Sequence, residues 1–131
     1  MTLGASAVHA NAVINILRNV TYTGLAGLFV KLHTSAGDPG PAGTSNASAL
    51  ATRSALVLNA PSPDGFSSMA SLGSFTMTAS ETIRYVSLWD TAGPAGGLFV
   101  GSGQLSADKI VVASDVITFD TFVVSQGPIA A

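Results

Sequence analysis

His33 is the residue whose type and position could most readily do chemistry, because an imidazole acts as a general base or a metal ligand near neutral pH. It follows an apolar run at residues 27–32, and Asp38, Asp90 or a serine could complete a catalytic or metal-binding set. The spacings of such sets are missing from the sequence: there is no Gly-x-Ser-x-Gly elbow, no His-Glu-x-x-His pair and no phosphate loop. We therefore expect His33 to end a strand and bond a loop carbonyl, and we expect no enzyme activity.

The carboxylates are scattered, and most adjoin residues that favour turns. They are Asp38, Asp64, Glu81, Asp90, Asp108, Asp115 and Asp120. Bonds from these side chains to nearby backbone explain such positions, and no Asp-x-Asp-x-Asp-Gly calcium loop occurs. The chain has no cysteine, which excludes a thiolate site. The sequence thus predicts no metal and no cofactor, with an ion held by carboxylates that meet only in the fold as the alternative.

Tyr85 and Trp89 share one face of an apolar stretch at residues 83–89. Aromatic faces can serve as platforms for sugars, so these two residues are candidate glycan contacts. Packing in the core is the commoner fate of such side chains and is the competing interpretation.

The low content of charged residues indicates which kinds of partner the chain can bind. Of the 131 residues only 9% are charged, against about 25% in typical globular proteins. A surface this neutral costs little to desolvate, which suits a subunit covered by neighbours. A net charge of −2 with five Lys and Arg argues against nucleic acid, and no apolar run approaches the ~20 residues of a membrane span. We expect neither nucleic acid nor membrane as a partner.

One helix is predicted, at residues 6–20, where apolar residues recur at helical spacing. The apolar positions are Val8, Ala12, Val13, Ile16, Leu17 and Val20. Such a stripe must be covered, either by the rest of the chain or by a neighbour. Val13, Ile16 and Leu17 are therefore candidate partner contacts.

Beyond the helix the pattern changes to a period of two, which is typical of strands separated by turns rich in Gly, Pro, Asn and Ser. Strands are predicted at residues 27–32, 55–58, 74–78, 83–89, 98–102, 109–112 and 116–124. The predicted fold is mainly β, a single β-sandwich or barrel-like domain at residues 25–131 after an N-terminal α-helix in an arm at residues 1–24. The predicted members of a two-layer core are Phe75, Val86, Leu88, Phe119 and Val123.

Three segments, taken in order, resemble a family of small proteins of tailed bacteriophages. Residues 28–34 are similar to the family's Leu-Tyr-Val-x-Leu-His-Thr strand, which leads here to Asp38-Pro39-Gly40. Residues 86–105 match a strand ending in Trp-Asp, a Gly-Gly loop and a Leu-x-x-x-Gly-x-Leu segment in approximate form. Residues 112–119 are similar to its closing Val-x-Ala-Gly-Asp-x-Ile-x-Phe. The family's Ala-Arg pair is only approximated, at residues 51–53.

The family comprises virion surface proteins, minor tail, tail fibre-like or capsid decoration proteins of actinobacteriophage type. The resemblance implies a non-catalytic structural protein of the phage particle. We expect its synthesis in the host cytoplasm, because no cationic residue precedes the N-terminal apolar stretch as in a signal peptide. We expect it to act by self-association, as a trimer or a dimer, and by binding other virion proteins such as major capsid or tail proteins. The alternative is a module of the tail tip that binds a host receptor or glycan.

Overall fold

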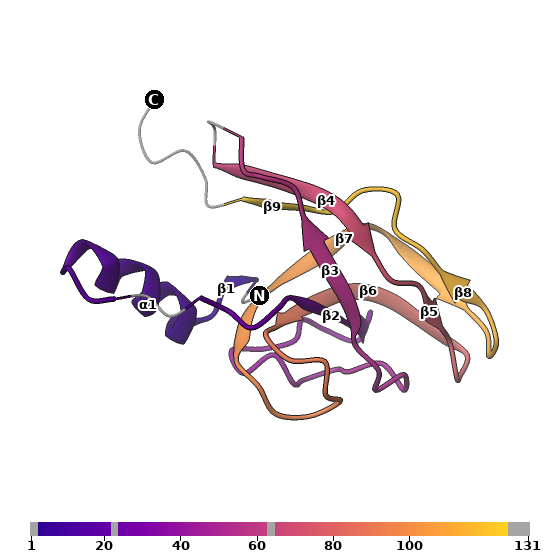
Figure 1. Ribbon diagram of the computed structural model, residues 1–131. Helices are drawn as coiled ribbons and strands as arrows, with labels where there is room; N and C mark the ends of the chain where they lie inside the picture. The colour runs from indigo at the N-terminus through magenta and orange to yellow at the C-terminus, as the bar shows by residue number, and fades with distance from the viewer. Residues whose placement is uncertain (1–2, 22–23, 63–64, 126–131) are drawn as a thin grey trace.

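The computed structural model describes residues 3–21, 24–62 and 65–125. Among the carboxylates named above, Asp64 lies outside these ranges. The mainly β fold with an N-terminal helix is confirmed (Figure 1). In chain order the elements are β1 (Gly4–Ala5), α1 (Ala7–Leu17), β2 (Phe29–Thr34), β3 (Ser54–Leu58), β4 (Phe66–Leu72), β5 (Phe75–Thr76), β6 (Glu81–Trp89), β7 (Phe99–Val111), β8 (Val116–Ile117) and β9 (Val123–Ser125).

The barrel-like alternative of the prediction is the one observed. Within the described residues, seven strands form one antiparallel sheet in the order β1-β7-β6-β2-β3-β4-β9. The sheet curls into a half-barrel, and the pair β5-β8 lies at the end opposite α1 (Figure 1). The edges of the curled sheet, β1-β7 and β9, are not paired with each other, so the barrel is open along one seam.

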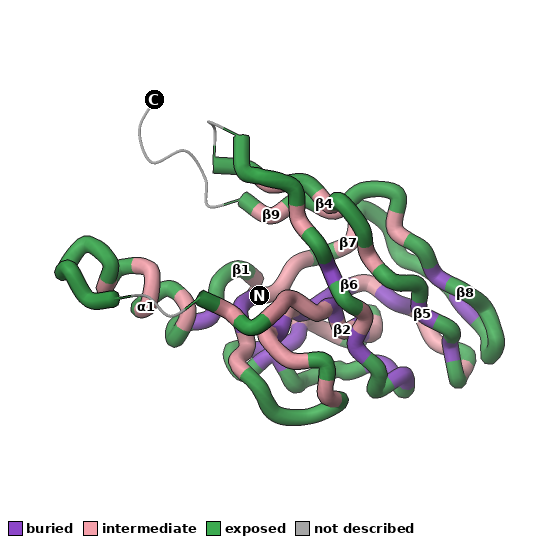
Figure 2. The backbone as a smooth tube through the Cα atoms, viewed as in Figure 1, coloured by how far each residue is buried: buried purple, intermediate pink, exposed green. Residues whose placement is uncertain are grey.

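The core lies inside the curl, where β2 and β6 supply most of its centre (Figure 2). Val30, Leu32 and Ile83 are fully buried because the alternation of these two neighbouring strands places them on the inner face. Among the five predicted core residues, Phe75 and Val86 are buried, and Leu88 and Phe119 are partly buried against the cluster.

Val123 was predicted to be in the core and this is wrong, because its side chain is 59% exposed. The reason is that the predicted strand at residues 116–124 is not continuous. β8 ends at Ile117, residues 118–122 leave the ladder, and β9 begins at Val123 against β4. Alternation is therefore interrupted, and residues counted on one face of a single strand lie in two different environments.

Other boundaries also differ from the prediction. The strands predicted at residues 98–102 and 109–112 are one strand, β7. Two strands were not predicted: β4, whose serines interrupt its apolar pattern, and the two-residue β1. Because β1 precedes α1 and pairs with β7, the N-terminal arm is anchored to the sheet at its root.

Candidate assembly surfaces

The root of the arm is tied to β7. The Ser6 backbone N–H donates to the Val100 carbonyl at 2.8 Å, and the Ser6 hydroxyl donates to the Phe99 carbonyl. The same hydroxyl oxygen accepts a bond from the His9 N–H at 3.2 Å, which is the usual N-cap of a helix. Ser6 thus starts α1 and fixes its point of departure from the sheet.

Beyond this root α1 extends away from the body (Figures 1 and 2). None of its eleven residues is buried, and it contains no Asp, Glu, Lys or Arg. Of the candidate contacts, Val13 is half-buried, Ile16 is exposed and Leu17 is 84% exposed. Exposed large apolar side chains are also found at Val8, within the predicted stripe, and at Ile14, outside it, so apolar groups occupy more than the single stripe that the sequence predicted. A helix that is apolar on most sides is normally enclosed by other protein.

A second candidate surface, which we call the trough, lies along the open seam of the half-barrel. It consists of two adjoining hollows of about 510 Å³ and 290 Å³ between β7 and residues 117–125. Both hollows are lined by Val86, Gly103, Phe122 and Val123. Leu105 and Phe119 line the larger hollow, and His9 at the start of α1 lines the smaller one. The trough therefore runs along β7 from the arm's root toward β8.

The lining of the larger hollow includes the charged residues Asp108, Lys109 and Asp120. Asp108 pairs with Arg84, with 3.3 Å between Oδ1 and Nε. Asp120 is exposed, and it forms no ion pair with any residue in the described part of the chain. The lining of the trough thus combines apolar side chains with polar and charged ones.

Tyr85 and Trp89 are inside the molecule, with 9% and 5% of their surfaces exposed. The Arg53 guanidinium stacks over the Trp89 ring at 4.1 Å, and Phe99 packs beside that ring. Neither residue offers a free face to a sugar. Both side chains are packed in the interior, as the competing interpretation expects.

Arg53 is an important residue whose role was not predicted. Its Nη1 donates to the carbonyls of Thr91 and Gly96 and to the Thr91 hydroxyl, each at 3.0 Å, and so secures the loop after β6. Burial lowers the pKa of the Arg53 guanidinium, and the nearby Asp90 partly offsets this effect. The only advance signal was its place in the approximate Ala-Arg pair.

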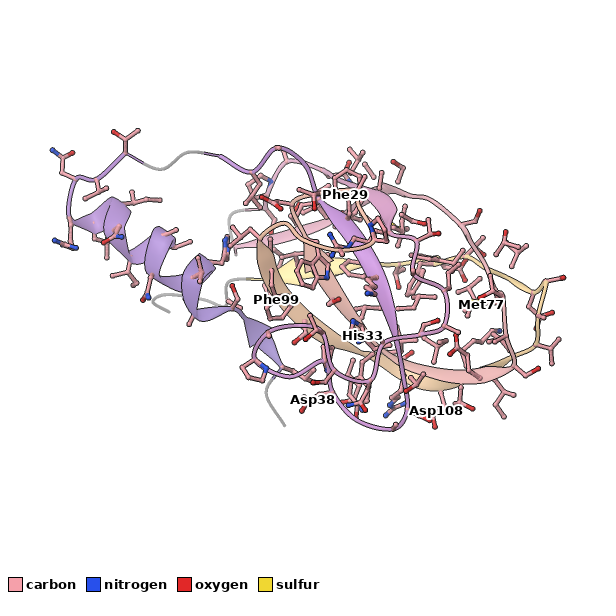
Figure 3. The ribbon with its side chains drawn as sticks, turned by 90° about the horizontal axis from the view of Figure 1, so that it is seen from below. Phe29, His33, Asp38, Met77, Phe99 and Asp108 are labelled. Atoms are coloured by element: carbon pink, nitrogen blue, oxygen red, sulfur yellow. The ribbon has the colours of Figure 1, made fainter. Side chains whose placement is uncertain are left out.

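His33 is fully buried between the sheet and the loop that follows β2 (Figure 3). Its Nδ1 donates to the Ser45 carbonyl at 2.8 Å, which confirms the predicted bond to a loop carbonyl. Its Nε2 lies 2.7 Å from the Ser87 hydroxyl, and that oxygen accepts a bond from Trp89 Nε1 at 2.8 Å. Because a carbonyl can only accept, Nδ1 carries the proton and Nε2 accepts from Ser87 in neutral His33.

Burial lowers the pKa of His33; the bond to Ser45 opposes this effect, and the charge of Lys31 adds to it. Asp38 and Asp90 do not reach His33. Asp38 Oδ1 accepts the Gly40 N–H at 2.8 Å, and Asp90 Oδ1 accepts the Leu98 N–H at 2.6 Å. His33, Asp38 and Asp90, the residues considered for catalysis, thus each bond to backbone groups of loops and stabilise the loop conformations.

Among the described residues, no group of three or more His, Cys, Asp and Glu side chains could hold a metal ion. In the same part of the chain, no helix has the length and apolar character needed to cross a membrane.

Comparison with known proteins gives one family. Residues 4–125 match the model of the family described as podophage GP4 fiber I protein gp80. No curated protein matches the chain. The match confirms the resemblance to tail fibre-like phage proteins, whereas the narrower actinobacteriophage type receives no support. Since the match spans most of the 131 residues, the chain belongs to the family of podophage GP4 fiber I protein gp80, a family of phage fibre proteins.

Proposed function

We propose that the chain is a non-catalytic structural subunit of the phage tail, joined to further copies of itself and to other virion proteins. The observation that carries this proposal is α1, an uncharged and largely apolar helix with no buried residue. In a fibre, neighbouring subunits can pack against such a helix and bury its exposed apolar side chains. Membership of a fibre family favours the tail over the capsid surface as the location.

Weak individual contacts suffice for this function. In a particle, identical subunits are held at high local concentration, so many modest contacts act together. The low charge of the chain, 9%, reduces both repulsion between copies and the cost of desolvating their faces.

Binding of a host receptor or glycan was the alternative, with Tyr85 and Trp89 as contacts. Both rings are covered, by Arg53 and Phe99 in the case of Trp89. No specific observation favours that function, and we retain the structural one.

The test is the composition of purified particles of the phage that encodes the chain. The chain should co-purify with particles, and antibody against it should label tails in electron micrographs. A double variant with Ile16→Asp and Leu17→Asp should be lost from particles, whereas Val57→Asp, at an exposed apolar position on β3, should be retained. Absence of the intact chain from particles would refute the structural role, and labelling of capsids alone would refute the tail location.

A further inference from the structure

We infer that the trough is the docking site for α1 of a second copy of this chain, so that each subunit inserts its helix into the next. This inference rests on the proposed function, which requires self-association, and it assigns the two surfaces that meet. Both surfaces present apolar side chains and are open within one copy: the helix has no buried residue, and the trough lies along the open seam of the half-barrel.

The direction of the chain keeps each helix out of its own trough. In the antiparallel pairing, Gly4 lies opposite Ser102 and Ala5 opposite Gly101, and Ser6 then bonds Val100. The chain thus runs along β7 toward Phe99, whereas the larger hollow lies along residues 103–109 in the opposite direction. His9 at the start of α1 lines one end of the trough. From there α1 leads away from the body of the sheet (Figure 1). A helix that fills the trough must therefore come from another copy.

Dimensions and charge agree with a helix as the occupant. The eleven residues of α1 span about 16 Å at 1.5 Å per residue, and residues 103–109 of β7 extend over about 20 Å or less. In this arrangement the uncharged helix meets the apolar side chains of Leu105, Phe119 and Phe122 in the lining. Arg18, directly after α1, forms no ion pair within the described residues, and Asp120 in the lining is likewise unpaired there. The two charges are complementary.

The free edge of β7 does not favour an added strand as the occupant. Lys109 pairs with Ile83 and Gln104 with Tyr85, so residues 105–108 stand opposite Arg84 alone and bulge from the ladder. A bulge of this kind disrupts the regular row of backbone groups that strand addition requires. Side chains of an incoming helix need no such row.

The helix and the trough are different surfaces, so the contact is heterologous and must close into a ring or continue as a filament. A reciprocal pair is the smallest closed arrangement and a ring of three is the next, and the mass of the assembly in sedimentation distinguishes them.

The absence of cysteine allows a direct test by cross-linking. One population carries Asn11→Cys, at an exposed polar position of α1, and a second population of different tagged size carries Thr121→Cys, which lines the larger hollow. A short bis-maleimide should join the two populations after mixing. Val57→Cys in place of Thr121→Cys should give at least tenfold less mixed product. Equal yields, or no mixed product with Thr121→Cys, would overturn the inference.

A charge exchange gives a second, independent readout. Arg18→Asp or Asp120→Arg alone should weaken self-association measured by sedimentation, and the double variant should restore it. Additive weakening in the double variant would contradict the assigned pairing. If the helix and trough fail these tests while the chain is still found on particles, the proposed function stands without this contact. If they pass while the chain is absent from particles, the contact stands and the proposed function fails.

Discussion

The centre of the sheet and the N-terminal arm use their residues in opposite ways. Around His33, Ser87 and Trp89, polar groups are buried, and each finds a partner inside the chain. Along α1, most large apolar side chains are exposed, and the described part of the chain buries no residue of the helix. The contrast teaches that the neutral composition serves two purposes: in the centre it gives a self-sufficient fold, and in the arm it leaves a surface for assembly.

The largest expected effect is on the folded core. Phe75→Ala should lower the free energy of unfolding by about 3–5 kcal/mol, because the Phe75 ring is buried and packs edge-to-face on Phe119. Leu17→Ala in the arm should change it by less than about 0.5 kcal/mol, as expected for an exposed residue. Urea denaturation followed by the fluorescence of the single tryptophan gives both values. Equal losses in the two variants would abolish the proposed contrast.

The buried polar chain is the next most sensitive part. Ser87→Ala leaves His33 Nε2 and Trp89 Nε1 without their shared partner, and each unsatisfied group costs about 1–3 kcal/mol. Ser106→Ala, at an exposed serine of β7, is the matched control and should be nearly neutral. Thermal unfolding of both variants is the measurement. A neutral Ser87→Ala would mean that the polar chain does not stabilise the centre.

Acid should weaken the centre through His33. Burial lowers the pKa of folded His33 below its unfolded value of about 6.5, so the unfolded state binds more protons as the pH falls through that value. Stability is therefore full above about pH 6.5 and is lost below it. Urea midpoints at pH 7.5 and 5.5 should show a drop in the intact chain and a much smaller drop in His33→Gln. An identical drop in both proteins would exclude His33 as the cause.

The smallest effect concerns the junction of the two regions. A Cβ at Gly101 would lie 2.6 Å from the Gly4 carbonyl oxygen, whereas at Gly103 the nearest atom outside the adjoining residues would be Val86 Cγ2 at 3.8 Å. Gly101→Ala should therefore loosen β1 while the rest of the sheet remains, at a cost of about 1 kcal/mol or less. Hydrogen exchange at residues 4–6 should rise in Gly101→Ala and stay unchanged in Gly103→Ala. Unchanged exchange in both would mean that β1 does not depend on this close approach.

The local pattern of apolar and polar residues correctly predicted the central part of the sheet. The alternation of residues 83–89 identified β6, and the position of His33 at a strand end predicted its bond to a loop carbonyl, now seen to Ser45. Ser6 at the start of an apolar helical repeat also predicted the beginning of α1 closely. These features depend on neighbours in the sequence, which is why periodicity and capping rules find them.

The open seam of the half-barrel could not be predicted from the sequence. It depends on which segments lie next to each other in the fold without forming backbone hydrogen bonds between them. The break after Ile117 turns residues 118–122 into one wall of the trough, and nothing in their alternation signals it. The role of Arg53 is similar, since its partners Thr91 and Gly96 are about forty residues away and are brought close only by the curl of the sheet.

Sedimentation velocity of the intact chain beside the double variant Ile16→Asp and Leu17→Asp tests the central claim most directly. We predict that the intact chain sediments as an oligomer, with three subunits the expected number. The double variant should sediment as a monomer and keep the circular dichroism spectrum of the folded chain, because the substituted side chains are exposed within one copy. An intact chain that is monomeric, or a double variant that keeps the mass of the intact assembly, would contradict the assignment of the arm as the assembly surface.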